Sequence, residues 1–237
     1  MTKAVVRQRL MIPAYFTPGP LWAALDAAAG SVGIAIVNPH SGPGNAPSSA
    51  YAAQITESRA TGIAVIDYVD TDYASRPLSD VRCDIEYYTA WYGVDGIFLD
   101  QVSADRASLP YYAEASAAIK AGDATALTVL NPGAAIPESF MDVADIVVTF
   151  ENTYDAYTNN YRAPRWMRRY PPERFCHLVH AVPTEEALRR TLSLSKRRRA
   201  GWCYATPATL PNPWSTLPPD PYWAEELTMI GPSCSRA

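Results

Sequence analysis

Two carboxylates stand at the ends of short apolar runs in this sequence. The run GVDGIFLD ends in Asp100, and the run DIVVTFE ends in Glu151. Runs of this length and composition are typical of buried strands, and parallel barrels present acids at the carboxyl ends of their strands. A pair of carboxylates is the arrangement that cleaves glycosidic bonds, with one group as acid/base and the other as nucleophile or water activator. The sequence therefore predicts that Asp100 and Glu151 are catalytic.

The faces of these two strands decide whether the acids can meet. Residues two apart on a strand share a face, so we expect Asp100 to lie with Phe98 and Glu151 to lie with Thr149. An isolated carboxylate at a strand end more often forms an ion pair with an arginine or caps a helix. Two carboxylates at equivalent positions favour the catalytic interpretation, provided that both faces line the barrel.

Lysines and glycines disfavour two other kinds of barrel chemistry. A Schiff-base aldolase needs a lysine at a strand end, whereas Lys3 lies in the amino-terminal segment and Lys120 and Lys196 lie in predicted helices. A sugar-phosphate barrel commonly has glycine-rich turns after strands seven and eight, where this chain has VPTEE and TPATLPNP. Neither chemistry is expected here.

The histidines do not form a pattern of metal ligands. His40 stands alone in a loop, and His177 and His180 are expected on opposite faces of one strand. We therefore expect neither a metal nor a cofactor.

Eight apolar runs alternate with segments that carry helical signals. Alternation of this kind predicts parallel strands covered by helices, and eight strand–helix pairs in 237 residues match a single-domain (β/α)8 barrel spanning 1–237. A doubly wound open sheet is the competitor, but the first strand is not followed by GxGxxG. The proline-rich segment 206–219 is expected to be a stiff wall of a cleft, followed by a terminal helix over about 220–230. The expected strands are 9–16, 32–38, 62–69, 93–100, 126–131, 145–151, 176–182 and 201–205.

Two helical segments have clear local signals. Thr184 precedes two glutamates and is expected to cap a helix. In another segment Val81, Ile85, Tyr88 and Tyr92 recur at three and four residues, which predicts one buried helix face.

Composition limits the partners. The chain is 48% hydrophobic and 19% charged, as expected for a compact globular fold, and its net charge of −4 argues against nucleic acid, whose phosphates need a basic surface. No apolar run is long enough to span a membrane, and the start MTKAVVRQRLMIPAYF has no export signal. We expect a cytoplasmic chain as written, or a secreted one if an export signal has been removed. The sequence gives no signal for an oligomeric state.

Aromatic residues near the strand ends could stack on a sugar ring. Core packing is the commoner fate of such rings. The candidates are Tyr15, Tyr68, Tyr73, Trp202 and Tyr204.

Six sequence blocks carry a resemblance to a known family. They are IPAYFTPG, AIVNPHSGPG, GIAVIDYVDTDYASR, DIEYYTAWYGVDGIFLD, VLNPG and VVTFEN. From about residue 10 to about residue 205, their order and spacing resemble the spherulin-4 family of (β/α)8 glycoside hydrolases, whose characterised relatives are fungal endo-α-1,4-N-acetylgalactosaminidases that cut galactosaminogalactan. The resemblance implies an acid pair at Asp100 and Glu151. The family commonly follows its first acid with a second, and here that neighbour is Gln101.

Two functions follow from these residues. The first is an endo-acting, retaining glycoside hydrolase on α-linked galactosaminide or galactoside chains, with Asp100 as nucleophile and Glu151 as acid/base by analogy with other α-galactoside barrels. The alternative is a non-catalytic carbohydrate-binding barrel that has lost the second acid. Either would take an oligosaccharide or polysaccharide, and residues at or near the strand ends are expected to contact it. These are Tyr15, Asn38, Tyr68, Gln101, Asn131 and His180.

Overall fold

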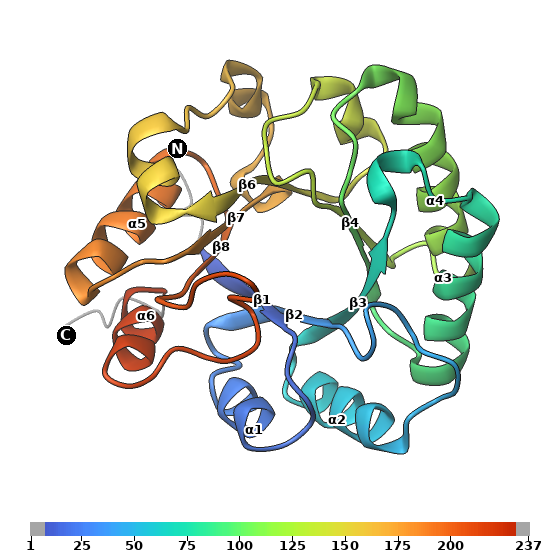
Figure 1. Ribbon diagram of the computed structural model, residues 1–237, viewed down its shortest axis with the longest axis horizontal. Coiled ribbons are helices and arrows are strands. Elements are labelled where there is room, and N and C mark those ends of the chain that lie inside the picture. The colour runs from blue at the N-terminus through green and yellow to red at the C-terminus, as the bar shows by residue number, and fades with distance from the viewer. Residues whose placement is uncertain (1–7, 231–237) are drawn as a thin grey trace, which may run out of the picture.

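Eight parallel strands close into a barrel in the computed structural model, which describes residues 8–230 (Figure 1). Neighbours in the ring follow chain order, and β1 pairs with β8 through Leu10 and Cys203. The predicted fold class and all eight predicted strands are therefore confirmed. The strands are β1 Arg9–Ala14, β2 Val32–Val37, β3 Ala64–Asp70, β4 Gly96–Asp100, β5 Leu127–Leu130, β6 Ile146–Thr153, β7 Phe175–His180 and β8 Trp202–Ala205.

The strands are apolar because both of their faces are covered. Every residue of β2, which reads VGIAIV, is buried. One face packs inside the barrel and the other packs under helices, as in other parallel sheets. This double burial explains why the strands read as continuous apolar runs rather than as alternating patterns.

α-Helices surround the strand ring on most of its circumference (Figure 1). Thr184 accepts a hydrogen bond from the Ala187 backbone at 3.1 Å and caps α5, as predicted. The predicted apolar face on α3 is also confirmed, since Val81, Ile85 and Tyr88 are all buried. The helices are α1 Pro20–Ala27, α2 Ser49–Ala60, α3 Leu78–Tyr92, α4 Leu109–Gly122, α5 Glu185–Arg197 and α6 Tyr222–Ile230.

The expectation of a full helix after every strand is wrong at two connections. Between β5 and β6 lies only the short 3-10 helix η3, Glu138–Asp142. Between β6 and β7 lie a π-helical turn, η4 (Ala156–Asn160), and two short 3-10 helices, η5 (Arg165–Arg169) and η6 (Pro172–Arg174). Prolines recur through both segments, and proline removes the backbone donor that a continuing helix needs.

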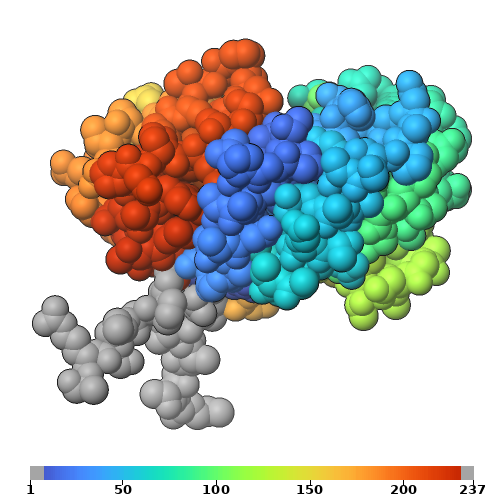
Figure 2. Space-filling view, turned by 90° about the horizontal axis from the view of Figure 1, so that it is seen from below, coloured from blue at the N-terminus to red at the C-terminus, as the bar shows by residue number. Residues whose placement is uncertain are grey.

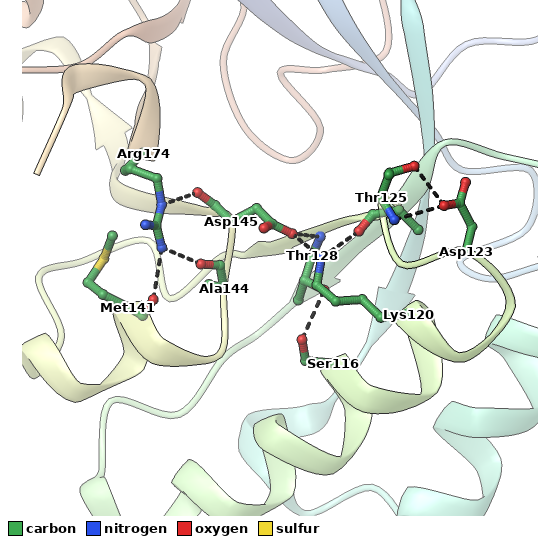
Figure 3. A network of polar contacts seen from close by, with 10 residues as sticks. Ser116, Lys120, Asp123, Thr125, Thr128, Met141, Ala144, Asp145 and Arg174 are labelled. Carbon is green, nitrogen blue, oxygen red and sulfur yellow. Dashed lines mark hydrogen bonds and ion pairs between the residues drawn. The ribbon is translucent and has the colours of Figure 1, made fainter.

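Polar contacts fasten this helix-poor side to the rest of the barrel (Figure 3). The guanidinium of Arg174 donates to the carbonyls of Ala144 and Asp145, both at 2.5 Å. The Asp145 carboxylate accepts from Lys120 Nζ and from the Thr128 backbone, both at 2.8 Å. The start of β6 is therefore tied to β5 and α4 by hydrogen bonds where a covering helix is missing.

The two ends of the described chain meet beside the seam of the barrel. Figure 2 shows the carboxyl-terminal part, in red, packed against the amino-terminal part, in blue. The Ser31 hydroxyl donates to the Leu227 carbonyl at 3.5 Å, which links the start of β2 to α6. Among the helices of residues 8–230, none is both long and apolar enough to cross a bilayer.

Candidate active site

Two adjoining hollows lie at the carboxyl ends of the strands, and Asp100 and Glu151 line both. We call them the Tyr73 lobe, of about 490 Å³, and the Trp214 lobe, of about 310 Å³. The Tyr73 lobe is also lined by Gln101, Asn131, Pro132, Gly133, Asn152 and Thr153, and the Trp214 lobe by Tyr15, Asn38, Tyr68, Pro211, Asn212 and Pro213. His180 and Leu210 line both lobes, so the two acids lie where the lobes meet.

Asn131 joins the two acids directly. Its Nδ2 donates to Asp100 Oδ1 at 2.7 Å and to Glu151 Oε2 at 2.5 Å. Because both bonds leave one amide nitrogen, the two acceptor oxygens are separated by no more than the sum of the two bond lengths, about 5 Å. The two side chains thus face each other across a single amide group.

A β-bulge brings Glu151 into the cleft. The pairing of β6 with β7 shifts register between Val148 and Phe150, so the alternation of faces breaks there. Thr149 points outward and contacts Nε2 of His177 at 3.1 Å, whereas Glu151 lines the cleft. The expectation that Glu151 shares a face with Thr149 is therefore wrong. The expectation for Asp100 holds, since Phe98 stacks with Tyr68, a cleft residue.

The turn after β5 holds Glu151 from its backbone side. Gly133 has φ of 61°, a left-handed conformation that glycine adopts without strain. Its carbonyl accepts from the Glu151 backbone at 2.9 Å, and its N–H donates to Asn131 Oδ1 at 3.0 Å. Asn131 was predicted to contact the sugar, and it lines the Tyr73 lobe as that prediction requires. Its amide also binds protein groups at both ends, so it holds the two acids in place.

Burial and the neighbouring acid raise the pKa of Glu151 to about 7. Hydrogen bonds from Asn131 and from Trp214 Nε1, the latter at 3.1 Å to Oε1, favour the charged form and offset part of this rise. A carboxyl group with a pKa near neutrality can keep its proton until a reaction needs it, as a general acid must.

Asp100 lies in the same desolvated site but receives more donors. Burial raises its pKa, and hydrogen bonds from the Gln101 backbone and from the Tyr68 and Asn131 side chains act against that rise. Hydrogen bonds to a carboxylate stabilise its ionised form. Three donors therefore act against the rise at Asp100, whereas two act against the rise at Glu151.

The other predicted contact residues all line the cleft. Tyr15 and Tyr68 meet edge to face, with ring centroids 5.7 Å apart, in the Trp214 lobe. Asn38 lies beside them, and its Oδ1 accepts from the Gly42 backbone at 3.1 Å, so it also shapes the loop after β2. His180 ends β7 between the lobes, and burial lowers the pKa of its imidazole.

Gln101 lines the Tyr73 lobe next to Asp100. Its φ of 50° is in the left-handed region, and its carbonyl accepts from the Tyr73 backbone and from Thr71 Oγ1 at 2.8 and 2.9 Å. The turn after β4 is therefore fastened to the turn after β3.

Trp214 and Leu210 were not singled out from the sequence. Both lie in the proline-rich segment, which forms a wall of the cleft as predicted. The signal was the proline content of this wall, but nothing local indicates that the Trp214 indole reaches Glu151. Among the aromatic candidates, Trp202 instead donates to the Glu173 carbonyl, at the start of β8, and Tyr204 is buried beneath Trp214.

The lining of both lobes carries no lysine or arginine. Lys120 and Lys196 lie in α4 and α5, and Lys3 lies outside the described residues. His177 is buried against Tyr157 and Tyr161 on the outer side of β7, and burial lowers its pKa to about 3. Residues 8–230 contain no group of three metal-binding side chains.

A third hollow, of about 450 Å³, lies at the opposite ends of β3, β4 and β5. The ion pair between Arg59 and Asp95, at 2.8 Å, spans this hollow. In that third hollow Asp95 is paired with an arginine, whereas Asp100 and Glu151 face each other at the carboxyl ends of the strands, where barrel enzymes have their active sites.

Solved structures share this fold. Sph3 of Aspergillus clavatus, solved in complex with GalNAc, superposes with a TM-score of 0.80 at 26% identity, over 95% of this chain and 98% of that one. Cyclic α-maltosyl-(1→6)-maltose hydrolase of Arthrobacter globiformis has a TM-score of 0.59 at 11% identity, over 97% and 78% of the two chains. A variant glycoside hydrolase domain of PelA from Pseudomonas aeruginosa has a TM-score of 0.52 at 13% identity, over 85% and 95%. These likenesses show that the barrel has a fold that glycoside hydrolases also have.

Sequence comparison gives the family. Spherulin-4 of Physarum polycephalum is 34% identical over 167 residues, or 69% of this chain, and the chain spans about half the length of that relative, 50%. Residues 9–230 match the spherulation-specific family 4 over nearly the whole chain. The chain, with its closed barrel and its paired acids at the mouth, belongs to the spherulation-specific family 4.

Proposed function

We propose that this protein is an endo-acting, retaining glycoside hydrolase that cleaves α-1,4-linked galactosaminide or N-acetylgalactosaminide chains. The observation that carries the proposal is the Asn131 bridge between Asp100 and Glu151, at the junction of two sugar-sized lobes. Catalytic carboxylates of retaining glycosidases are about 5–5.5 Å apart, and those of inverting enzymes about 6.5–9.5 Å apart. The bridged oxygens of Asp100 and Glu151 are no more than about 5 Å apart, which fits the shorter of these separations and supports retention.

In the first step the Asp100 carboxylate attacks the anomeric carbon, and the bond from that carbon to the bridging oxygen breaks. Glu151 gives its proton to the departing oxygen, so that the leaving chain is released as an alcohol. Asp100 then carries the sugar as an ester, and Glu151 is a carboxylate.

In the second step Glu151 takes a proton from water, and the water oxygen bonds to the anomeric carbon. The ester bond to Asp100 breaks, which restores the Asp100 carboxylate and the protonated Glu151. Trp214 and Asn131 stabilise Glu151 while it is charged, because each donates a hydrogen bond to one of its oxygens.

The charges of the cleft support a neutral or cationic sugar. Its ionisable acids are Asp100 and Glu151, and its lining has no cation to neutralise a phosphate or uronate. The complex of the 26% identical Sph3 with GalNAc supports an amino sugar of galacto configuration. Because a lobe opens on each side of the acids, the cleft favours cleavage within a chain.

A non-catalytic carbohydrate-binding barrel is the second candidate, since Gln101 stands where the family commonly has a second acid. Glutamine can hydrogen-bond a sugar but cannot ionise. The test is reducing-end release from galactosaminogalactan by the native chain, Asp100→Asn and Glu151→Gln. We expect release by the native chain and a loss of at least 10²-fold in both variants. Release at background level from all three would favour the binding protein.

The stereochemistry has its own test. Proton NMR of the first product should show the α anomer if the mechanism retains configuration. The β anomer as first product would refute the nucleophilic role of Asp100 while leaving hydrolysis intact.

A further inference from the structure

We propose that the Tyr73 lobe is the leaving-group subsite, in which the ring of Tyr73 stacks on the sugar that follows the cleaved bond and Leu210 closes the other side. This inference rests on the proposed function and names the subsite that none of the comparisons assigns. The ligand is a galacto-configured pyranose, whose C3–C4–C5 face presents C–H groups that pack on an aromatic ring, while its edges carry hydroxyl and amide groups.

The side chains of Tyr73 and Leu210 are unusually exposed for large hydrophobic residues. Tyr73 is 60% exposed and Leu210 is 70% exposed, yet both line the Tyr73 lobe. Among residues 8–230 the remaining large hydrophobic side chain with such exposure is Tyr87 at 46%, which stacks on Trp91 outside the cleft. An exposed ring at the rim of a cleft has apolar area to bury when a ligand enters.

The backbone that carries Tyr73 has an unfavourable, left-handed conformation. Asp72, Tyr73 and Ala74 have φ of 43°, 53° and 70°, three consecutive left-handed residues without a glycine. Such a conformation is unfavourable for residues with a Cβ and persists only where surrounding bonds hold it. The Tyr73 N–H donates to the Gln101 carbonyl at 2.8 Å, and Ala74 N donates to the Thr71 carbonyl at 2.9 Å.

These bonds fix the backbone that carries the ring relative to the nucleophile. Gln101 is the neighbour of Asp100, and Thr71 N donates to the Asp100 carbonyl at 3.1 Å. The turn that carries Tyr73 is thus attached by its backbone to the residue proposed to attack the sugar. A rigid stacking platform loses little entropy on binding, which is why its position relative to the reacting atoms matters.

Differences between the two lobes indicate which sugar of the substrate each lobe holds. The sugar attacked by Asp100 develops positive charge, which a carboxylate stabilises more strongly where water is excluded, and the Trp214 lobe has the buried rings of Tyr68 and Trp214 beside the acids. The Tyr73 lobe is larger, and its aromatic ring, that of Tyr73, is exposed rather than buried. Asn152 and Thr153 also line it, and can meet sugar hydroxyls. A larger lobe with an exposed ring suits the part of the substrate that must leave first.

The test compares two substrates in each variant. One is an N-acetylated α-1,4-galactosaminide tetrasaccharide, and the other is the α-glycosyl fluoride, whose leaving group fills no lobe. Tyr73→Asn removes the ring and keeps a residue that accepts a left-handed backbone. We expect the ratio of kcat/KM for the tetrasaccharide to kcat/KM for the fluoride to fall about tenfold in Tyr73→Asn, and less than twofold in Tyr73→Phe.

The matched control is Tyr87→Asn, which removes an exposed tyrosine outside the cleft and should leave the ratio unchanged. Equal losses on both substrates in Tyr73→Asn would overturn the assignment, because the ring would then act on the attacked sugar. An unchanged ratio in a folded variant, checked by circular dichroism, would overturn it as well.

Binding separates this inference from the proposed hydrolysis. In the Glu151→Gln background, calorimetric titration with the tetrasaccharide should give a Kd about tenfold weaker when Tyr73→Asn is added. If the native chain cleaves neither substrate but this difference in Kd is observed, the hydrolytic proposal fails and the stacking site stands. Equal Kd values for Glu151→Gln with and without Tyr73→Asn would remove the stacking site.

Discussion

Replacing Asn131 with leucine should shift the pH dependence of kcat/KM for this protein to higher pH. Asn131 donates one hydrogen bond to each acid, at 2.7 and 2.5 Å, and leucine branches at Cγ as asparagine does but has no donor. A hydrogen bond to a charged group contributes about 1.5–3 kcal/mol, and one pKa unit corresponds to about 1.36 kcal/mol. The loss should raise the pKa of Glu151 from about 7 by about 1–2 units.

The sign follows from the roles of the two groups. Activity needs protonated Glu151, so kcat/KM falls as pH rises through the pKa of that group. A higher pKa shifts this alkaline limb to higher pH. Asp100 must be ionised, and it also loses a donor to its charged form, so the acid limb should move in the same direction. We further expect kcat to fall about 10²-fold, because the two acids are no longer held together.

The measurement is kcat/KM on the tetrasaccharide between about pH 4 and 10, with a carbon NMR titration of the Glu151 carboxyl group as a direct reading. Asn159→Leu is the control, since that amide donates to Asp155 at 2.7 Å on the exposed surface, away from the cleft. A lower rate with both limbs in their original positions would refute the electrostatic role of Asn131 and leave only a role in positioning.

Three further changes test the site and the fold. Trp214→Phe removes the donor to Glu151 but keeps a ring, so the alkaline limb of kcat/KM should shift by about one unit to higher pH. An alkaline limb at its original pH would contradict a role for this hydrogen bond. Gln101→Glu places a second carboxylate beside Asp100, so the acid limb of kcat/KM should move to higher pH by about one unit, and a downward shift would show that the new side chain points elsewhere. Glu226 is fully buried on α6 and caps the end of β8 through the Ala205 backbone at 2.9 Å, and burial raises its pKa to about 8. A carboxyl whose pKa rises on folding stabilises the native state least at high pH, so stability is lost as pH rises from about 4.5 toward 8, by up to about 5 kcal/mol. Glu226→Gln should therefore be more stable than the native chain in urea unfolding at pH 9 and nearly equal to it at pH 4, and equal stabilities at both pH values would contradict this.

The barrel could be predicted because its signals are local. Each strand is buried on both faces, so its apolar run can be read without knowledge of its neighbours, and the Thr184 cap depends on a few adjacent residues. The two connections without α-helices were less readable, since short 3-10 and π turns lack a repeating apolar pattern.

The site was predictable in its residue types and less so in its geometry. Asp100 lies on the expected face because β4 is regular. Glu151 reaches the cleft only because the pairing of β6 with β7 slips by one residue, and its neighbour Thr149 turns outward. A bulge depends on how two strands pair, which a single run does not record.

The amino-acid pattern alone indicated which segments are strands, that they are parallel, and that an acid lies at or near the end of two of them. The folded chain was needed to see that Asn131 bonds both acids, that Trp214 contacts Glu151 from 63 residues away, and that Tyr73 lines the same cleft. Local burial and turn chemistry act over a few residues and leave a pattern in the chain. Convergence at the mouth depends on ring closure and on where the loops settle, and these follow from contacts between residues far apart in sequence.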